Sequence, residues 1–371
     1  MESSFTGETS NLATRIARAK NLSGHPGGRI LLEDPAVEAA VIEMPRKGLI
    51  RFGHPCDRYD VAVLLNVQDD HIGVDGINSL EEMAYLKAEV LERATQAIVV
   101  NAEDPLCLAM RERARAPRHI LVARDVVTPA LREHLQSGGH AVFAQVLHQG
   151  IPWIVLAEGT AQAPLMPLAD IPATMNGLLR LNEINALFAP ALAWAQGVAP
   201  ETICAALASF ANTAEQNPGR YNFISGFPFQ VLLDYGHNPD GVRELCDLVA
   251  KLPVTGQRRL LNLKIGNRHR VHLTTLAPAL AQTFDRFILG CDRDYVKQNA
   301  DYVSEDPEDA MLTASRVSLF EHGISADSIT VERDQSQALR LALASAQPGD
   351  LLVLLAEPWV ALPVLNAARN A

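Results

Sequence analysis

The sequence lacks the features that mark membrane and secreted proteins. No apolar run reaches the roughly 18 to 20 uninterrupted residues that a membrane-spanning helix needs. The N-terminal stretch MESSFTGETSN is polar and does not have the basic-then-apolar order of a secretory signal. We therefore expect a soluble, cytoplasmic protein without a membrane partner.

Cysteine and positive charge are also scarce. The five cysteines lie far apart and form no Cys-x-x-Cys pair, so neither a disulfide framework nor a structural zinc site is supported. The 32 Lys and Arg residues against 43 Asp and Glu residues give a net charge of −11. An acidic chain repels the phosphate backbone, so we expect no general binding to nucleic acid.

What the chain does contain is ample apolar material. Its 371 residues are 48% hydrophobic and 20% charged, which excludes a disordered chain and a small disulfide scaffold. At roughly 150 residues per domain, this length indicates two or three domains.

The first part of the chain has the pattern of a βαβ unit. After a short helix, apolar runs predict buried strands over Ala39–Met44 and Tyr59–Val67. Ser79 opens the capping-box sequence S-L-E-E of a helix that extends to about Ala94, and a further strand follows over Ala97–Asn101. Strand, helix and strand in this order predict a parallel sheet.

The pattern then changes twice along the chain. Short strands between Pro117 and Ala163 predict an antiparallel extension of the sheet, and two alanine-rich helices follow over about Leu181–Ala195 and Pro200–Phe210. The polar stretch Ala211–Asn217 is the best candidate linker. We therefore predict two domains, residues 1–215 and 216–371.

The second domain shows another alternation of strands and helices, which predicts a Rossmann-like fold. Its expected strands are Phe229–Asp234, Arg259–Leu263, Arg286–Leu289, Ile329–Val331 and Asp350–Leu355.

Polar residues gather where the predicted strands end, and ligands of open α/β sheets bind at that edge. Alone, each such residue is more often a helix cap or a turn former. Together they suit Mg²⁺ and a phosphate-bearing substrate. In the first domain they are Glu43, Asn66, Asp69, Asp70, His71, Asn101, Glu103 and Asp104.

Further candidates lie on helices and after the linker. Lys87 follows His71 on the helix that returns along the sheet, where a surface lysine is the simpler interpretation. Asn182 and Asn185 are three residues apart and face the same way on one helix. Arg220 suits a phosphate, and the run Asp234–Pro239 follows the first strand of the second domain.

Several of these segments, taken in order, resemble the Mur ligase family, and most closely the Mur-ligase half of the cyanophycin synthetases. They are VIEMPRKGLIRFG, NVQDDHIGVDGINSLEEMAYLKAEVL, VVNAEDP, NPGRYNFI and VLLDYGHNPDGV. The resemblance implies an α/β fold in which a central domain, its parallel sheet incomplete at the N-terminal edge, precedes a Rossmann-like C-terminal domain. It also implies an ADP-forming amide-bond ligase that uses ATP and Mg²⁺.

The resemblance implies a role for each matching residue of the first domain. Glu43 and His71 correspond to Mg²⁺ ligands. Lys87 corresponds to a lysine that many Mur ligases carbamylate to bind a second Mg²⁺. Asn182 and Asn185 correspond to amides near the adenine.

The matching residues of the second domain correspond to contacts with both substrates. Arg220 and Asp234 correspond to residues that contact phosphate and ribose, and His237 and Asn238 to residues near the amino-acid substrate. In cyanophycin synthetase this half adds arginine to the side-chain carboxylate of an aspartate polymer, so arginine and that polymer are the implied substrates.

The sequence departs from the family at the phosphate-binding loop. Gly-Lys-Ser or Gly-Lys-Thr occurs nowhere in the chain, and only Thr6–Ser10 has a faint likeness to that loop. Leu181 stands where the family has a histidine before the paired asparagines. Both departures bear on the handling of ATP more than on the fold.

Two classes of function therefore stay open. One is a ligase of the cyanophycin synthetase type, active alone or as a piece of a larger synthetase, with a polyglutamate or folate-type glutamate ligase as the alternative within that chemistry. The other is a catalytically inactive protein that binds polymer, peptide or a partner synthetase. For either class, a homo-oligomer or a partner synthetase is the expected assembly. The lost loop favours the second class, and the retained Glu43, His71, Lys87, Arg220 and Asp234 favour the first.

Overall fold

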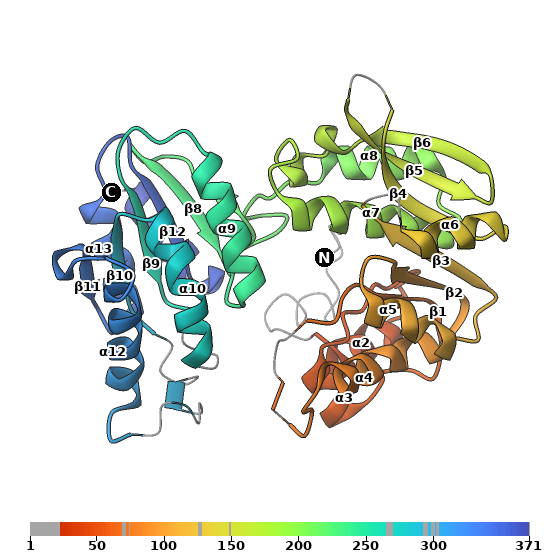
Figure 1. Cartoon of the computed structure of the whole chain (residues 1–371), viewed down its shortest axis with the longest axis horizontal. Helices are drawn as coiled ribbons and strands as arrows, with labels where there is room; N and C mark the ends of the chain where they lie inside the picture. The colour runs from red at the N-terminus through yellow and green to blue at the C-terminus, as the bar shows by residue number, and fades with distance from the viewer. Residues whose placement is uncertain are drawn as a thin grey trace. The chain divides into compact units, whose positions relative to one another are not determined.

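The chain divides into two compact units, Met1–Phe210 and Ala211–Ala371 (Figure 1). The computed structural model describes residues 23–68, 72–73, 75–124, 128–147, 150–264, 270–291, 296–297, 301 and 304–370. The boundary lies five residues before the one expected from the sequence, at the start of the predicted linker.

The first unit is built on a six-stranded sheet in the order β1-β2-β3-β4-β5-β6. The strands from β1 to β4 pair in parallel, and β5 and β6 extend the sheet in antiparallel pairs. The antiparallel extension expected between Pro117 and Ala163 therefore begins only at β5, because β3 and β4 continue the parallel part of the sheet. The elements are α2 (His25–Glu33), α3 (Arg46–Phe52), β1 (Tyr59–Leu64), α4 (Leu80–Glu92), β2 (Ala94–Asn101), α5 (Pro105–Met110), β3 (Arg118–Ala123), α6 (Pro129–Gln136), β4 (His140–Val146), β5 (Pro152–Glu158), β6 (Ala161–Pro167), α7 (Arg180–Ala195) and α8 (Pro200–Ser209), with short 3₁₀ turns at Arg111–Arg113, Leu168–Asp170 and Pro172–Thr174.

Both faces of this sheet are covered by helices, and the alternation along the central strands explains why. In β2, Ile98 and Val100 pack into the core that α4, α5 and α6 share. Ala97 and Val99 point the other way, into the core with α7 and α8. Because successive side chains of a strand face opposite sides, a continuous apolar run is what a sheet covered on both faces requires.

The strand predicted over Ala39–Met44 is not formed, and this prediction is wrong. The segment has no regular structure, and the Val41 side chain is 70% exposed. A strand needs a neighbour to complete its hydrogen-bond ladder. Here the carbonyl of Glu43 accepts instead from the N–H of Gly24, just before α2, at 2.8 Å.

The second unit contains another six-stranded sheet, in the order β11-β10-β9-β12-β8-β7. All its pairs are parallel except β7 with β8, so the prediction of a second α/β domain is confirmed. Its elements are β7 (Asn222–Phe223), β8 (Gln230–Asp234), α9 (Pro239–Lys251), β9 (Arg258–Asn262), α10 (Arg270–Thr283), β10 (Arg286–Leu289), α12 (Pro307–Phe320), β11 (Ile329–Val331), α13 (Gln335–Ser345), β12 (Leu351–Leu355) and α14 (Pro358–Arg369), with a 3₁₀ turn at Ala326–Ser328.

The order of the central strands creates a switch point in this sheet. The chain crosses from β8 to β9, and β12 returns later to lie between them. The register brings Asp234, Leu355 and Asn262 level with one another, so all three strands end at one edge. In open α/β sheets such an edge is the usual place for a ligand.

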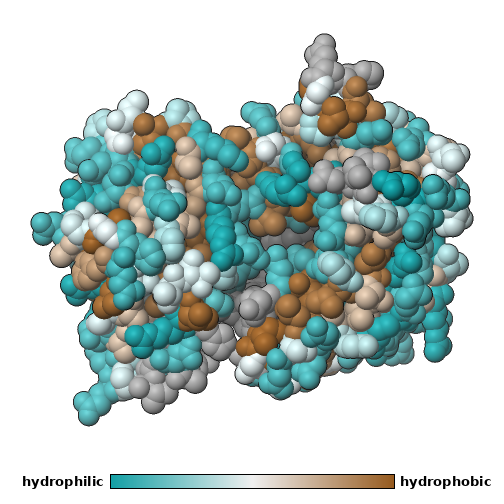
Figure 2. Space-filling model, viewed as in Figure 1, coloured by the Kyte–Doolittle hydropathy of each residue, from teal (hydrophilic) through white to brown (hydrophobic). Residues whose placement is uncertain are grey.

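The surface in view is mostly hydrophilic, with apolar residues in scattered patches (Figure 2). Within the part of the chain that the structure describes, no helix is both long and apolar enough to span a bilayer.

At the opposite, amino end of β12, a buried carboxylate ties the sheet together. Asp350 is 3% exposed and accepts hydrogen bonds from the backbone N–H groups of Gln257 and Gln347 and from the Arg259 guanidinium, at 2.7, 2.9 and 2.5 Å. Burial raises the pKa of this carboxyl, but these three donors outweigh it and hold the pKa below its ordinary value.

We expect Asp350→Asn to lower the free energy of unfolding by about 3 kcal/mol at pH 7, because it removes the buried carboxylate that pairs with the partly buried Arg259. A depressed folded-state pKa contributes stability that is present above the unfolded pKa and is lost as the pH falls through the folded pKa. The difference between wild type and variant should therefore shrink below about pH 4. Urea denaturation of both proteins at several pH values measures this difference in stability. A difference that does not change with pH would contradict a lowered pKa for Asp350 in the folded state.

Candidate functional site

In the first unit, the loops after β1 and β2 are fixed to each other by two side chains. The Asn101 amide donates to the carbonyl of Leu65 at 2.9 Å. Asp104 caps α5 and also accepts from the N–H of Val67 at 2.7 Å. These residues therefore act as the turn formers and caps that the simpler interpretation of the sequence allowed, and they hold the carboxyl edge of the sheet in place.

Lys87 reaches this edge from α4. The predicted N-cap is present, since Ser79 accepts from the N–H of Glu82 at 3.1 Å. The Glu82 carboxylate accepts from the N–H of Asn78 at 2.6 Å, one residue before the N-cap that a capping box would use. The helix that begins there carries Lys87 beside β1, where its ammonium donates to the carbonyl of Asn66 at 3.1 Å. The lysine is therefore anchored at the carboxyl end of β1.

Of the two predicted Mg²⁺ ligands, Glu43 alone lies in the part of the chain that the structure describes. Glu43 is exposed on the irregular segment before α3. His71 lies outside the described residues, as do Asp69 and Asp70. Within the described ranges, no group of three or more His, Cys, Asp or Glu residues is arranged to hold a metal ion. The metal site stays a prediction.

The paired asparagines lie in the first turns of α7, and their side chains have different surroundings. The Asn182 amide donates to the carbonyl of Ala173 at 2.7 Å, which fastens α7 to the preceding turn. Asn185, one turn further, is exposed. Asn182 is therefore part of the scaffold, while Asn185 has the accessible amide that a ligand needs.

Beside them, sequence reasoning missed a buried ion pair. Glu183 is 3% exposed, and its carboxylate accepts from the Arg124 guanidinium at 2.7 Å. The pair joins the end of β3 to the start of α7. The one signal in the sequence is a glutamate near the start of a helix that is mostly apolar.

In the second unit, Asp234 ends β8 and is almost fully enclosed. It is 2% exposed, and its two oxygens accept from the N–H groups of Tyr221 and Gly236 at 3.0 and 2.5 Å. Burial raises the pKa of this carboxyl, against the opposing effect of the backbone donors and the nearby Arg220.

Arg220 stands next to this carboxylate but faces outward. Its side chain is exposed, and its guanidinium lies 5.3 Å from the centre of the Tyr235 ring. A guanidinium on an aromatic face keeps its hydrogen-bond donors available in one plane. Such a group can bind a phosphate or a carboxylate by two hydrogen bonds.

His237 and Asn238 follow on the same turn, with different surroundings. His237 Nδ1 lies 3.0 Å from the carbonyl of Tyr235, and its ring meets the Tyr235 ring edge-on at 5.2 Å between centroids. Asn238 caps α9 by accepting from the N–H of Gly241 at 2.9 Å. The Tyr235 contacts therefore orient the His237 imidazole, whereas the side-chain oxygen of Asn238 is used to cap α9.

A second buried ion pair, also missed from the sequence, completes this edge. Lys264, just after β9, pairs with Glu357, just after β12, and both residues are less than one-tenth exposed. The ammonium lies 4.4 Å from the centre of the Tyr235 ring. Trp359, 63% exposed, lies next to that ring at 6.2 Å. The sequence signal for this ion pair was a charged residue shortly after each of two predicted strands.

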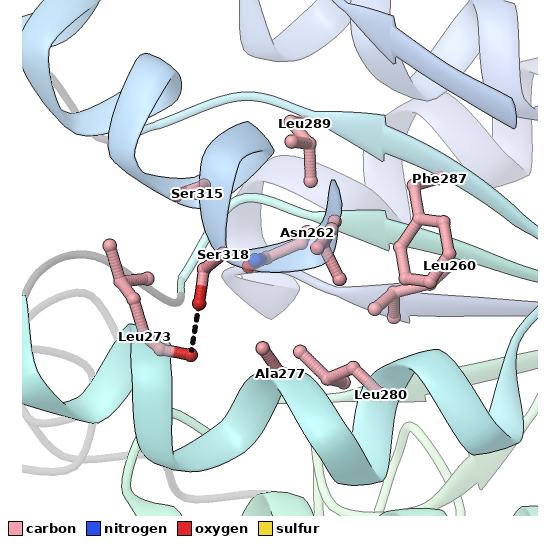
Figure 3. Close-up of a pocket in the computed structure, with 10 residues that line it drawn as sticks. Leu260, Asn262, Leu273, Ala277, Leu280, Phe287, Leu289, Ser315 and Ser318 are labelled. Carbon is pink, nitrogen blue, oxygen red and sulfur yellow. Dashed lines mark hydrogen bonds between the residues drawn. The ribbon is translucent and has the colours of Figure 1, made fainter. Parts of the chain in front are cut away.

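The second unit also contains a small cavity under one face of its sheet (Figure 3). It lies between α10 and α12 and the strands β9 and β10, and Leu260, Leu280 and Phe287 are among its mostly apolar walls. Ser318 donates across it to the carbonyl of Leu273 at 3.3 Å. Asn262 projects toward it, and its Oδ1 accepts from the N–H of Lys264 at 3.1 Å. With no charged group in its walls, it suits packing rather than phosphate chemistry.

Comparisons with known proteins match both units. Residues 18–134 match the Mur ligase middle domain, and residues 219–357 match the Mur ligase glutamate ligase domain. Cyanophycin synthetase of Synechocystis sp. is 34% identical over 275 residues, which are 73% of this chain and 30% of that protein. Cyanophycin synthetase of Crocosphaera subtropica is 31% identical over 346 residues, 92% of this chain and 37% of that protein.

The fold is also found in a solved structure. UDP-N-acetylmuramoylalanyl-D-glutamyl-2,6-diaminopimelate–D-alanyl-D-alanyl ligase from Acinetobacter baumannii superimposes with a TM-score of 0.61 at 18% identity, over 95% of this chain and 68% of that one. This chain thus spans only about a third of the cyanophycin synthetases that it matches, 30% and 37% of their length.

We expect Lys264→Met alone to lower the free energy of unfolding by about 3 to 5 kcal/mol, because it leaves the Glu357 carboxylate buried without its partner. The double variant Lys264→Met/Glu357→Leu removes both charges and should be close to wild type in stability. Guanidinium denaturation of the three proteins measures the difference. Equal losses in the single and double variants would contradict a buried, mutually compensated pair.

Proposed function

Because this chain belongs to the Mur ligase family, we propose that it joins a carboxylate to an amine in an ATP-dependent reaction. The γ-phosphoryl group of ATP passes to the carboxylate and leaves ADP. The amine then attacks the carbonyl carbon of the acyl phosphate and loses a proton, and the tetrahedral intermediate expels phosphate. The chemistry demands neutralisation of phosphoryl charge and exact positioning rather than a protein nucleophile.

The finer proposal is that the amine is arginine and the carboxylate is an aspartate side chain of a polymer. The two cyanophycin synthetases, at 34% and 31% identity, support it. Since this chain spans about a third of those proteins, the activity of the whole synthetase is itself part of the proposal.

The observation that carries the proposal is the exposed Arg220 guanidinium at the switch point of the second sheet. The nearby Asp234 carboxylate is buried and accepts backbone hydrogen bonds from Tyr221 and Gly236. The Arg220 charge is therefore turned outward, toward an anionic ligand such as a phosphate. The oriented His237 imidazole lies on the adjoining turn, where it can hydrogen-bond to the second substrate.

In the first unit, the proposal assigns nucleotide and metal contacts to residues outside the sheet together with Lys87 at the carboxyl end of β1. Glu43 offers an exposed carboxylate, a ligand type that Mg²⁺ prefers, and His71 is its proposed companion. Bound Mg²⁺ would neutralise charge on the phosphoryl oxygens. Lys87 adds a positive charge held at the end of β1, and Asn185 presents an accessible amide for the base.

A second function is favoured by one specific observation, the absence of Gly-Lys-Ser/Thr from the sequence. Without that loop the chain lacks the backbone cradle and the lysine that hold the phosphates of ATP. The alternative proposal is a protein that binds the polymer, an arginine-containing peptide or a partner synthetase without catalysis.

We expect the purified chain with Mg²⁺, ATP, a polyaspartate primer and arginine to release ADP, and Arg220→Ala to lower kcat/KM for ATP by at least about 100-fold, as loss of a charge-stabilising group does. Arg340→Ala, which removes an exposed arginine of α13, is the matched control and should behave as wild type. A coupled assay for ADP measures all three proteins.

The outcomes separate the two proposals. ADP release that Arg220→Ala leaves unchanged would remove Arg220 from the site. No ADP release, together with no heat of nucleotide binding in calorimetry, would refute the ligase and leave the binding protein.

A further inference from the structure

The second sheet carries two arginines side by side near the amino ends of its strands. Arg259 of β9 and Arg286 of β10 are partners in the parallel register, so both side chains leave the sheet on the same face. Leu352 of β12 is the partner of Arg259 on its other side. Like charges at directly opposed positions destabilise a sheet, so a row of this kind calls for groups that compensate the charge.

The described chain compensates only one of these two charges. The Asp350 carboxylate accepts from Nε of Arg259 at 2.5 Å. Arg286 donates through Nη1 to the backbone carbonyl of Asp327 at 2.8 Å, and a carbonyl carries no net charge. Among the ion pairs of the described residues, none includes Arg286. One positive charge of the row is therefore left without a counter-charge.

Both arginines line a pocket on this face of the sheet. Its volume is about 280 Å³, close to the lower end of the ~300 to 1,000 Å³ range of small-molecule sites. Arg259 also donates through Nη2 to the side chain of Gln257 at 2.8 Å. Within the described ranges, Nη1 of Arg259 and both Nε and Nη2 of Arg286 make no hydrogen bond. Three guanidinium donors are thus available to a ligand.

The pocket also offers apolar and neutral surface beside the arginines. Ile288 lies two residues along β10 from Arg286 and therefore on the same face, with Thr330 of β11 as its register partner. Helix α13 contributes Leu341, which is 39% exposed, and Ser345. A ligand here would meet positive charge at the start of the strands and aliphatic side chains next to it.

We propose that this pocket binds a small organic monoanion, with its carboxylate on Arg286 and Arg259 and its apolar body against Ile288 and Leu341. A carboxylate accepts two hydrogen bonds in one plane, which matches the fork of a guanidinium. Its single negative charge equals the one positive charge that Asp350 leaves uncompensated.

This pocket is separate from the edge at which the ligase reaction is proposed. It lies where β9 and β10 begin, at Arg258 and Arg286, whereas Asp234 ends β8 at the carboxyl edge of the same sheet. The proposal therefore does not depend on the proposed function, and its test needs no ATP.

Saturation-transfer NMR on the full chain tests the pocket with benzoate as the probe. Benzamide, which has the same shape and no charge, is measured beside it. We expect benzoate to bind with a Kd on the order of 1 mM, as a ligand of so few atoms does. Benzamide should bind at least about tenfold more weakly, because its hydrogen bonds are not charge-assisted. Inorganic phosphate, an anion without an apolar body, should not displace benzoate at equal concentration.

Three variants locate the binding site. Arg286→Gln removes the uncompensated charge and should weaken benzoate by about tenfold to a hundredfold. Ser345→Trp keeps both arginines but fills the pocket, so it should abolish benzoate binding. Arg316→Gln is the matched control, since it removes an exposed arginine of α12 that is not among the lining residues, and it should bind benzoate as the wild type does. Circular dichroism checks that each variant is folded, and Arg286→Gln decides alone if Ser345→Trp is not.

Several results would overturn the proposal. Equal affinities for benzoate and benzamide would show that the negative charge is not recognised. Displacement of benzoate by an equal concentration of phosphate would show that the apolar body is not. An unchanged affinity in Arg286→Gln, or an equal loss in Arg316→Gln, would show that benzoate does not bind at this pair of arginines.

Discussion

Carboxylates that accept backbone N–H groups are the interaction on which both units depend. Asp104 joins the loops after β1 and β2, Asp234 joins two turns at the carboxyl edge of the second sheet, and Asp350 closes its amino edge. Parallel strands end with polar backbone groups that no neighbouring strand satisfies, and burying them is costly unless a partner is supplied. A carboxylate can satisfy several at once, and it makes the geometry of the edge specific rather than merely compact.

The need to satisfy these backbone groups explains why the residues of the family-like motifs divide into two kinds. One kind forms hydrogen bonds with the protein's own backbone, as Asn182, Asn238 and Asp234 do. Arg220, Asn185 and Glu43 are exposed, so they keep their polar groups accessible. A motif such as DYGHNP is therefore not a row of equivalent ligands. Part of it builds the turn, and the turn presents the remainder at a defined place.

How far the sequence predicts the structure depends on the range of the interaction. The N-cap at Ser79 and the strands β2 and β12 follow from local chemistry and apolar patterning, and they are confirmed. Ala39–Met44 has the composition of a strand but not the neighbour that a ladder needs, and composition cannot report a neighbour. The ion pairs Arg124–Glu183 and Lys264–Glu357 join residues 59 and 93 positions apart, so no local pattern reveals them. The roles of the site residues stay predictions, because chemistry at a site depends on ligands and not on the fold alone.

The position of β12 between β8 and β9 has a consequence for the synthesis of the chain. β12 is the last strand made, yet it lies at the centre of the second sheet. Until β12 emerges from the ribosome, β8 and β9 have no common neighbour. The unpaired backbone N–H and C=O groups along their edges can then pair with other chains. The Lys264–Glu357 ion pair likewise forms only after Glu357, which follows β12, has been synthesised. The edge that carries Arg220 and His237 is thus completed only after Glu357 has been translated, and loss of β12 would remove the centre of the sheet rather than its margin.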